Sequence, residues 1–145
     1  MKGKKNGYGI HYYFSGAKYE GNWEDNKAHG QGSLHYSNGD KYSGEWYEGR
    51  KNGKGIYYFK NGSVYDGDWA EDSKEGFGVL KYENGDRYEG EWLKGEKSGK
   101  GVYFYEDGDV YEGEWKADKR HGAGCLTFKN GDRYIGDWVD GEKHG

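Results

Sequence analysis

The stretch NGDRYEGEW, residues 84–92, holds the pattern on which the fold of this chain depends. Its tyrosine, second glycine and tryptophan occupy alternate positions, so in an extended strand they point to one side and the two glutamates point to the other. The Asn-Gly pair that opens the stretch is the strongest short-range signal for a β-hairpin turn. The stretch therefore predicts a tight turn followed by a strand with one aromatic face.

This pattern returns along the chain at a constant spacing of 23 residues, without an insertion or a deletion. The tyrosines are Tyr19, Tyr42, Tyr65, Tyr88, Tyr111 and Tyr134, and the tryptophans are Trp23, Trp46, Trp69, Trp92, Trp115 and Trp138. A fixed period of a few tens of residues indicates small units that bury their apolar faces by stacking on one another. The chain is therefore expected to be a repeat array over residues 1–145, with six periods that end at Gly145.

The composition agrees with an ordered, soluble repeat protein. Only 32% of the 145 residues are hydrophobic, but 19% are aromatic and these occupy fixed positions, which argues against disorder. A net charge of −4 gives no general attraction to nucleic acid. No apolar run is long enough to span a bilayer and no signal segment opens the chain. The single cysteine, Cys125, fits a reducing compartment, so a cytoplasmic location is expected.

Each repeat is predicted to form one hairpin. The dipeptides Asn38-Gly39 and Asn84-Gly85 predict two-residue type I′ turns, and segments such as 24–29 predict a longer return loop. A Gly-x-Gly pair closes each unit, and we expect these pairs in turns between strands, where they open no helix and form no phosphate cradle. The predicted fold is all-β: a single-layer, elongated and twisted antiparallel sheet of about twelve short strands.

A glycine in the middle of every Tyr-x-Gly-x-Trp strand is unfavourable unless geometry requires it. It leaves space between the two rings and lets the strand bend. A bend at the same place in every repeat would curl the sheet into a trough with the aromatic face inside. The opposite face is predicted to be charged, with residues such as Glu89, Glu91, Glu112, Glu114 and Asp137.

The consensus YxGxWxxGxxxGxG, with a YxxG turn, resembles the MORN (membrane occupation and recognition nexus) repeat. The resemblance covers nearly the whole chain and implies an extended single-layer sheet that acts as a protein-binding scaffold, often in cytoskeletal, ciliary or cortical structures. It also implies phospholipid binding as an alternative. Residues 1–5 align with the loop that follows a tryptophan, so the chain is expected to be a segment of a longer array, with a naturally short protein as the alternative.

Two interpretations of the aromatic face stay open. The rings can be the core of a thin sheet, or they can form a groove that a helix or an extended peptide of a partner protein completes. The residues predicted to line such a partner groove are Tyr42, Trp46, Tyr65, Trp69, Tyr88, Trp92, Tyr111 and Trp115.

A membrane interpretation depends on one basic residue in each return loop. These residues are Lys51, Lys74, Lys97, Arg120 and Lys143. Stacked hairpins would place them in a row, and a basic edge of this kind can meet anionic phospholipid headgroups, phosphoinositides included. Acidic neighbours such as Glu48 and Glu96 dilute the row. Carbohydrate or choline binding by aromatic hairpins is a third interpretation, which the closing Gly-x-Gly pair and the lack of a secretion signal disfavour.

No constellation for catalysis is visible, so we expect no enzyme activity, no cofactor and no metal. Three of the five histidines, His29, His121 and His144, fill the same repeat position and are too far apart to share one ion. The adjacent glutamates are better explained as a surface ladder than as a catalytic pair. Unpaired sheet edges at residues 9–14 and 134–138 predict self-association through strand pairing.

Overall fold

The computed structural model describes residues 6–144 and contains thirteen β-strands in that range. The strands are β1 (Gly7–Tyr12), β2 (Lys18–Glu24), β3 (Lys27–His35), β4 (Lys41–Tyr47), β5 (Arg50–Tyr58), β6 (Val64–Ala70), β7 (Ser73–Lys81), β8 (Arg87–Leu93), β9 (Glu96–Phe104), β10 (Val110–Lys116), β11 (Lys119–Thr127), β12 (Arg133–Val139) and β13 (Glu142–His144). Over this part of the chain there is no helix that is long and apolar enough to cross a membrane.

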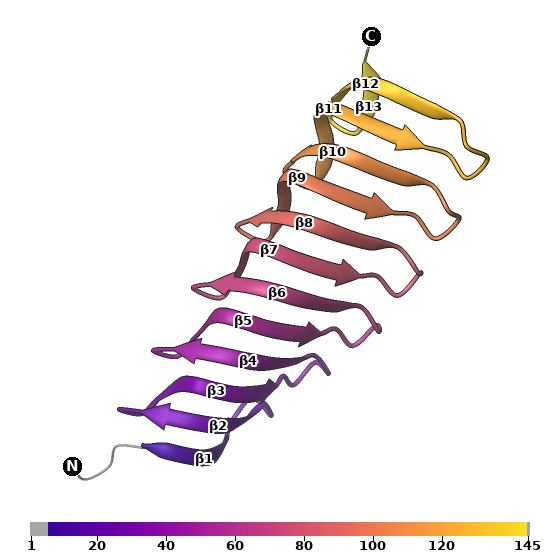
Figure 1. The fold of residues 1–145 in the computed structure, drawn as a ribbon. Coiled ribbons are helices and arrows are strands. Elements are labelled where there is room, and N and C mark those ends of the chain that lie inside the picture. Colours follow the sequence, from indigo (N-terminus) through magenta and orange to yellow (C-terminus); the bar gives the residue numbers. More distant parts are fainter. Residues whose placement is uncertain (1–5, 145) are drawn as a thin grey trace. The chain divides into compact units, whose positions relative to one another are not determined.

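The chain divides into two compact units between Ser73 and Lys74. In the first unit, β1 to β6 pair antiparallel in sequence order, and in the second unit β7 to β13 do the same (Figure 1). Within residues 6–144, no helix or second sheet covers either unit. The predicted class, all-β with one antiparallel layer of hairpins, is confirmed.

The ends of the array refine the strand prediction. The thirteenth strand, β13, lies in the incomplete last repeat and pairs with Asp137, Trp138 and Val139 of β12. The predicted open edge at residues 134–138 is therefore partly covered, whereas the described part of β1 pairs only with β2. Residues 1–5 and Gly145, on which the partial first repeat and the closing glycine were predicted, lie outside the described residues.

The Asn-Gly turns are not the predicted two-residue type I′ turns. The amide of Gly39 donates to the carbonyl of Tyr36 at 3.2 Å, and the amide of Tyr36 donates to the carbonyl of Asp40 at 2.9 Å. Gly39 has a φ of 103°, but Asn38 is not left-handed. The Asn38 carboxamide instead accepts the Asp40 amide at 2.9 Å. These contacts make a three-residue loop that ends in a left-handed glycine, a conformation that also uses Asn and Gly.

The two-residue turns lie at the other end of the hairpins. Asp25 and Asn26 have φ of 49° and 70°, and Ala117 and Asp118 have φ of 48° and 71°. Both central residues are left-handed, as a type I′ turn requires. The longer loop predicted at 24–29 is therefore wrong, because strand pairing already resumes at Lys27.

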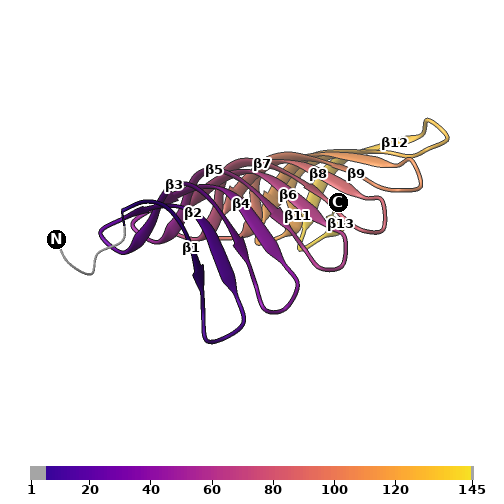
Figure 2. The same ribbon diagram turned by 90° about the horizontal axis from the view of Figure 1, so that it is seen from below.

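The Gly-x-Gly pairs were predicted in turns but lie inside strands. Gly53 and Gly55 belong to β5, and Gly55 pairs with Gly44 of β4. The next pair in the register is Trp46 with Lys51, so three residues of β5 oppose one residue of β4. The same shift follows the mid-strand glycine in β2, β8 and β10. A bulge of this kind bends a strand, which agrees with the predicted bend at this glycine and with the curved strands in Figure 2.

The repeat tyrosine packs against a glycine of the next strand in four repeats, as Tyr19 on Gly32, Tyr42 on Gly55, Tyr88 on Gly101 and Tyr111 on Gly124. The Tyr42 ring is fully buried, and its hydroxyl donates to the carbonyl of Glu45 at 2.9 Å. A Cβ atom at Gly55 would overlap the Tyr42 ring, so this position accepts glycine only. From the following repeat, the indole nitrogen of Trp69 donates to the carbonyl of Gly55 at 3.0 Å. Gly55, the second glycine of its Gly-x-Gly pair, thus contacts two aromatic side chains, Tyr42 and Trp69.

Candidate functional site

The rings form an edge-to-face ladder on one side of the sheet in each unit. Tyr42 contacts Trp46 of its own strand, with ring centres 5.1 Å apart, and Trp69 of the next repeat at 5.3 Å. In the second unit Tyr88 does the same with Trp92 at 5.2 Å and Trp115 at 5.3 Å. Planes in these pairs are nearly perpendicular, the arrangement that aromatic quadrupoles favour.

This packing decides between the two interpretations of the aromatic face. The eight side chains predicted to line a partner groove are all buried, with exposed fractions of 0% for the tyrosines and 4–7% for the tryptophans. They are Tyr42, Trp46, Tyr65, Trp69, Tyr88, Trp92, Tyr111 and Trp115. They form a core, and the open groove floor predicted from them is not present.

The basic residues predicted to form a lipid-binding row cover part of the aromatic ladder. Lys51 turns its ammonium group over the rings, 5.5 Å from the centre of Trp69 and 5.7 Å from that of Tyr42. It donates to the Tyr36 hydroxyl at 3.0 Å and pairs with Asp72 at 3.3 Å. Only 12% of the Lys51 side chain is exposed.

Lys97 repeats this arrangement in the second unit. Its ammonium group lies 5.7 Å from the centre of Tyr88, donates to the Tyr82 hydroxyl at 2.9 Å and pairs with Asp118 at 3.4 Å. Its side chain is also only 12% exposed. Because the cations of Lys51 and Lys97 face the rings and a carboxylate, these two members of the predicted lipid-binding row do not form an open basic edge.

The other three basic residues also reach aromatic rings. Lys74 lies 5.4 Å from the centre of Trp92, and Lys143 lies 5.2 Å from that of Tyr134. Arg120 stacks over Trp138 at 4.2 Å and donates to the Gly141 carbonyl at 2.7 Å. Cation–π contacts of this kind hold the charge against the sheet.

Burial changes the acidity of the ladder tyrosines. It raises the pKa of Tyr19 and of Tyr111 to about 12, and desolvation likewise raises the pKa of Tyr42, Tyr65 and Tyr88. At neutral pH these phenols stay protonated and donate to main-chain carbonyls. They act as structural hydrogen-bond donors there, not as bases.

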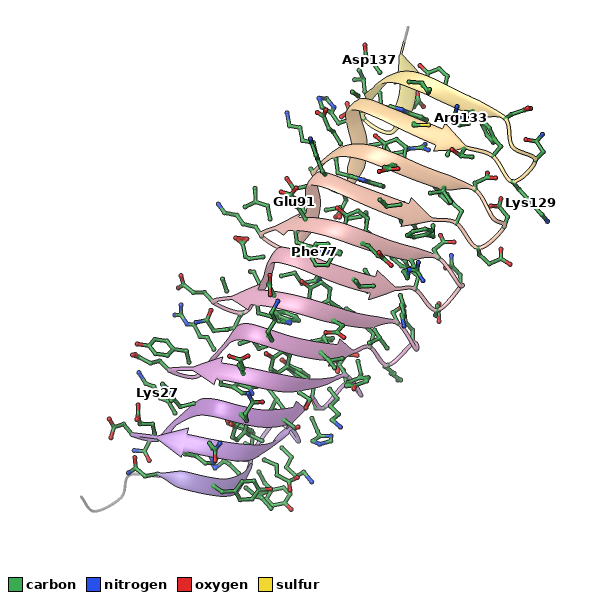
Figure 3. The ribbon with its side chains drawn as sticks, viewed as in Figure 1. Lys27, Phe77, Glu91, Lys129, Arg133 and Asp137 are labelled. Carbon is green, nitrogen blue, oxygen red and sulfur yellow. The ribbon has the colours of Figure 1, made fainter. Side chains whose placement is uncertain are left out.

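The other face of the second unit carries a groove of about 680 Å³. Its floor is the backbone of a glycine column, which consists of Gly90, Gly101, Gly113, Gly124 and Gly136. Apolar residues of the lining are Phe77, Val102, Ala123, Cys125 and Ile135, and the carboxylates are Glu89, Glu91, Glu112, Glu114 and Asp137. We call this site the glycine-floored groove. Figure 3 labels three of its side chains, Phe77 on β7, Glu91 on β8 and Asp137 on β12.

The groove is exposed, partly apolar and acidic. Phe77 and Ile135 are 53% and 72% exposed. Lys100 is the single basic residue of the lining and lies opposite Glu114 in the strand register. Five carboxylates therefore face one ammonium group, and such a surface attracts cations.

Some of these carboxylates also have structural partners. Glu89 pairs with Arg87 at 2.8 Å, and Glu91 accepts the amide of Lys100 at 3.2 Å, inside the bulge. Among residues 6–144, Glu112 and Asp137 take part in no ion pair and both are exposed. These two carboxylates are available to a ligand.

A second cavity, of about 450 Å³, lies in the first unit at the hairpin turns and includes Lys27, which Figure 3 labels. Its lining includes Arg50 and Glu71, which are paired with each other at 2.8 Å. In the described part of the chain, no three His, Cys, Asp or Glu side chains gather where they could hold a metal ion.

The sequence prediction placed the candidate site on the face whose rings are buried, although a signal for the groove on the other face was present. Glu89 and Glu91 flank the mid-strand glycine of one repeat, and Glu112 and Glu114 flank that of the next. Strand alternation alone puts all four on the face opposite the rings. That face was predicted to be charged, but nothing in the alternation shows that it is hollowed.

Comparison with known families identifies the repeat. The model of the MORN repeat matches seven consecutive segments, residues 1–18, 19–41, 42–64, 65–87, 88–110, 111–133 and 134–145. The chain belongs to the MORN repeat family. No curated protein matches this MORN repeat chain significantly.

Among solved structures, the MORN repeat chain is similar to the TCP domain of SAS-4 (dCPAP) from Drosophila melanogaster, solved in complex with a proline-rich motif of Ana2 (dSTIL). The two are 18% identical with a TM-score of 0.55, over 89% of this chain and 71% of that one. This likeness concerns the fold. Virginiamycin B lyase from Staphylococcus aureus also matches, at 11% identity and a TM-score of 0.28, over 90% of this chain and 55% of that one.

Proposed function

We propose that this MORN repeat chain is a non-enzymatic scaffold that binds a partner protein by holding an extended segment in the glycine-floored groove. The observation that carries the proposal is an exposed groove of about 680 Å³ on the face that the core rings leave open. The rings, by contrast, are buried, so a partner can reach the groove without disturbing the core.

The chemistry of the groove suits a peptide chain. A floor without side chains lets a partner backbone approach closely, while Phe77 and Ile135 offer apolar contact. The similar TCP domain binds a proline-rich motif, which supports an extended peptide over a helix. We also propose a cytoplasmic location, where the Cys125 thiol stays reduced.

Selection from a display library of random peptides tests the proposal. Peptides enriched on the wild-type protein are measured against Ala123→Trp, which fills the groove, and against Lys119→Trp, which adds the same side chain at an exposed position outside the lining. We expect about tenfold weaker binding to Ala123→Trp and no change with Lys119→Trp. Selected peptides that bind both variants equally would contradict the proposal.

Binding of anionic phospholipid through the basic row stays a separate prediction. Flotation of the wild-type protein with phosphoinositide vesicles measures it directly. Because Lys51 and Lys97 face the ring core, we give this function second place.

A further inference from the structure

Carboxylates line the glycine-floored groove from alternate strands. Carboxylates come from every second strand, with Glu112 and Glu114 on β10 and Asp137 on β12. The strands between them contribute small apolar side chains, Val102 on β9 and Cys125 on β11. The lining also includes Lys100 on β9 and Ile135 on β12, so the carboxylates carry the alternation and the apolar residues follow it only in part. The chemical period of the groove is therefore two strands, which is one MORN repeat.

This period has a definite length. Neighbouring strands lie about 4.8 Å apart, so acidic positions recur about every 9.6 Å across the sheet. Side chains on the same side of a β-strand recur about every 6.6 Å, which does not match. A polyproline II helix has three residues per turn and rises about 3.1 Å per residue, so every third side chain recurs about every 9.3 Å. The two repeats agree to within a few tenths of an ångström.

The charges of the groove complete the argument. Acidic positions on β8, β10 and β12 span four strand steps, about 19 Å, and three basic residues at every third position of a polyproline II segment span about 18.6 Å. The two residues between successive basic positions would then lie over β9 and β11, which contribute no carboxylate to the lining. Glu89 is paired with Arg87, and the other four carboxylates against one lysine favour a cationic segment over a neutral or acidic one.

We propose that the glycine-floored groove selects a polyproline II segment with a basic residue at every third position, seated across β8 to β12. This inference rests on the proposed function and names the chemistry of the partner. Each basic side chain pairs with the carboxylates of one MORN repeat, so that one repeat of the sheet binds one turn of the polyproline II segment.

Four nine-residue peptides of defined sequence test the proposal by fluorescence anisotropy. The first repeats Arg-Pro-Pro three times, and the second has the same composition with three arginines together followed by six prolines. The third and fourth replace each arginine of the first by glutamine and by glutamate. At about 0.1 M salt, where charges act over about 10 Å, we expect the first peptide to bind tightest and the glutamine peptide about tenfold more weakly. The arginine-block peptide should bind about threefold more weakly than the first, and the glutamate peptide should not bind.

Neutral variants of the protein locate the binding site. Glu112→Gln combined with Asp137→Asn removes two exposed carboxylates of the groove, so affinity for the first peptide should fall about fivefold while the glutamine peptide is unaffected. Glu96→Gln combined with Glu142→Gln removes the same charge from exposed positions outside the lining and should change neither affinity. Melting followed by circular dichroism checks that both double variants keep the fold.

Each contrary result has a defined meaning. Equal affinity of the first and block peptides overturns the spacing argument, and equal affinity of the first and glutamine peptides overturns charge selection. If library peptides bind in the groove but none of these four does, the inference fails and the proposed function stands. If the library also yields no peptide sensitive to Ala123→Trp, the proposed function fails as well.

Discussion

At the scale of single residues, Gly55 is confined to glycine by the tyrosine ring that packs against it. Gly55 has no left-handed φ, so its identity is required by the Tyr42 ring that lies on it and not by its backbone conformation. Gly9 occupies the same repeat position in the first hairpin, where a Cβ would meet only Trp23 at 3.4 Å. Gly55 and Gly9 are therefore equivalent repeat positions, one against a tyrosine ring and one without such a ring, that can be compared by mutation.

Gly55→Ala should destabilise the protein by about 2–3 kcal/mol, because the new methyl group overlaps a buried ring that cannot move away. Gly9→Ala should change the free energy of unfolding by less than about 1 kcal/mol, since its contact is an ordinary van der Waals distance. Urea denaturation measures both values. Equal losses of unfolding free energy for the two variants would show that contact with the tyrosine ring is not the reason for the glycine.

Lys97 is a second residue whose role the structure changes, from a predicted lipid contact to a cover for the rings. Lys97→Met keeps the length of the side chain but removes the cation from Tyr88 and from Asp118. We expect a loss of about 1–2 kcal/mol in the free energy of unfolding. Lys100→Met, at an exposed position, is the control and should cost less than about 0.5 kcal/mol. A similar small loss for Lys97→Met would mean that the ammonium group contributes little to covering the ladder.

At the scale of the hairpin, the type I′ turn predicted at the Asn-Gly end lies at the other end, and the Asn-Gly end has a three-residue loop. The Asn-Gly end needs one left-handed residue, which is glycine, whereas the other end needs two and fills them with residues such as Ala117 and Asp118. Alanine has no side-chain hydrogen bond to offset its left-handed conformation. The type I′ end therefore holds strain that the sequence pattern does not reveal.

Ala117→Gly should relieve this strain and raise the free energy of unfolding by about 0.5–1 kcal/mol, after the greater freedom of glycine in the unfolded chain is counted. The same substitution at Ala123, inside β11 and without a left-handed φ, should lower it by about 0.5–1 kcal/mol. Thermal melting compares the two directly. A lower melting temperature for Ala117→Gly would contradict the turn assignment.

At the scale of the whole molecule, the 23-residue period was enough to predict the class of fold and one antiparallel hairpin per repeat. Tyr88, Gly90 and Trp92 define one face by alternation alone, and each repeat confirms it. The turn types could not be predicted, because Asn38-Gly39 is compatible with both a type I′ turn and a three-residue loop. Whether the rings form a core or an open groove stayed undecided from the sequence, because their cover includes the long side chain of Lys51.

The buried tyrosines of both units make the protein sensitive to alkaline pH. The pKa of Tyr19 and Tyr111 is about 12 in the folded protein, against 10.0 for an unperturbed tyrosine. Above pH 10 the unfolded chain releases protons that the folded protein retains, so stability is fully present below pH 10 and is lost as the pH rises toward 12. Each of these two side chains accounts for roughly 3 kcal/mol of that loss.

We therefore expect cooperative unfolding between about pH 10 and pH 12, with tyrosinate absorbance rising together with the loss of the β-sheet circular dichroism signal. Tyr111→Phe removes one ionisable group from the core and should make the alkaline loss of stability less steep, measured as free energy of unfolding in urea at each pH. Tyr12→Phe changes a side chain that is 72% exposed and should leave the profile unchanged. Tyrosinate formation by the ladder residues while the sheet signal persists would show that the rings reach solvent without unfolding, and the core assigned to them would be wrong.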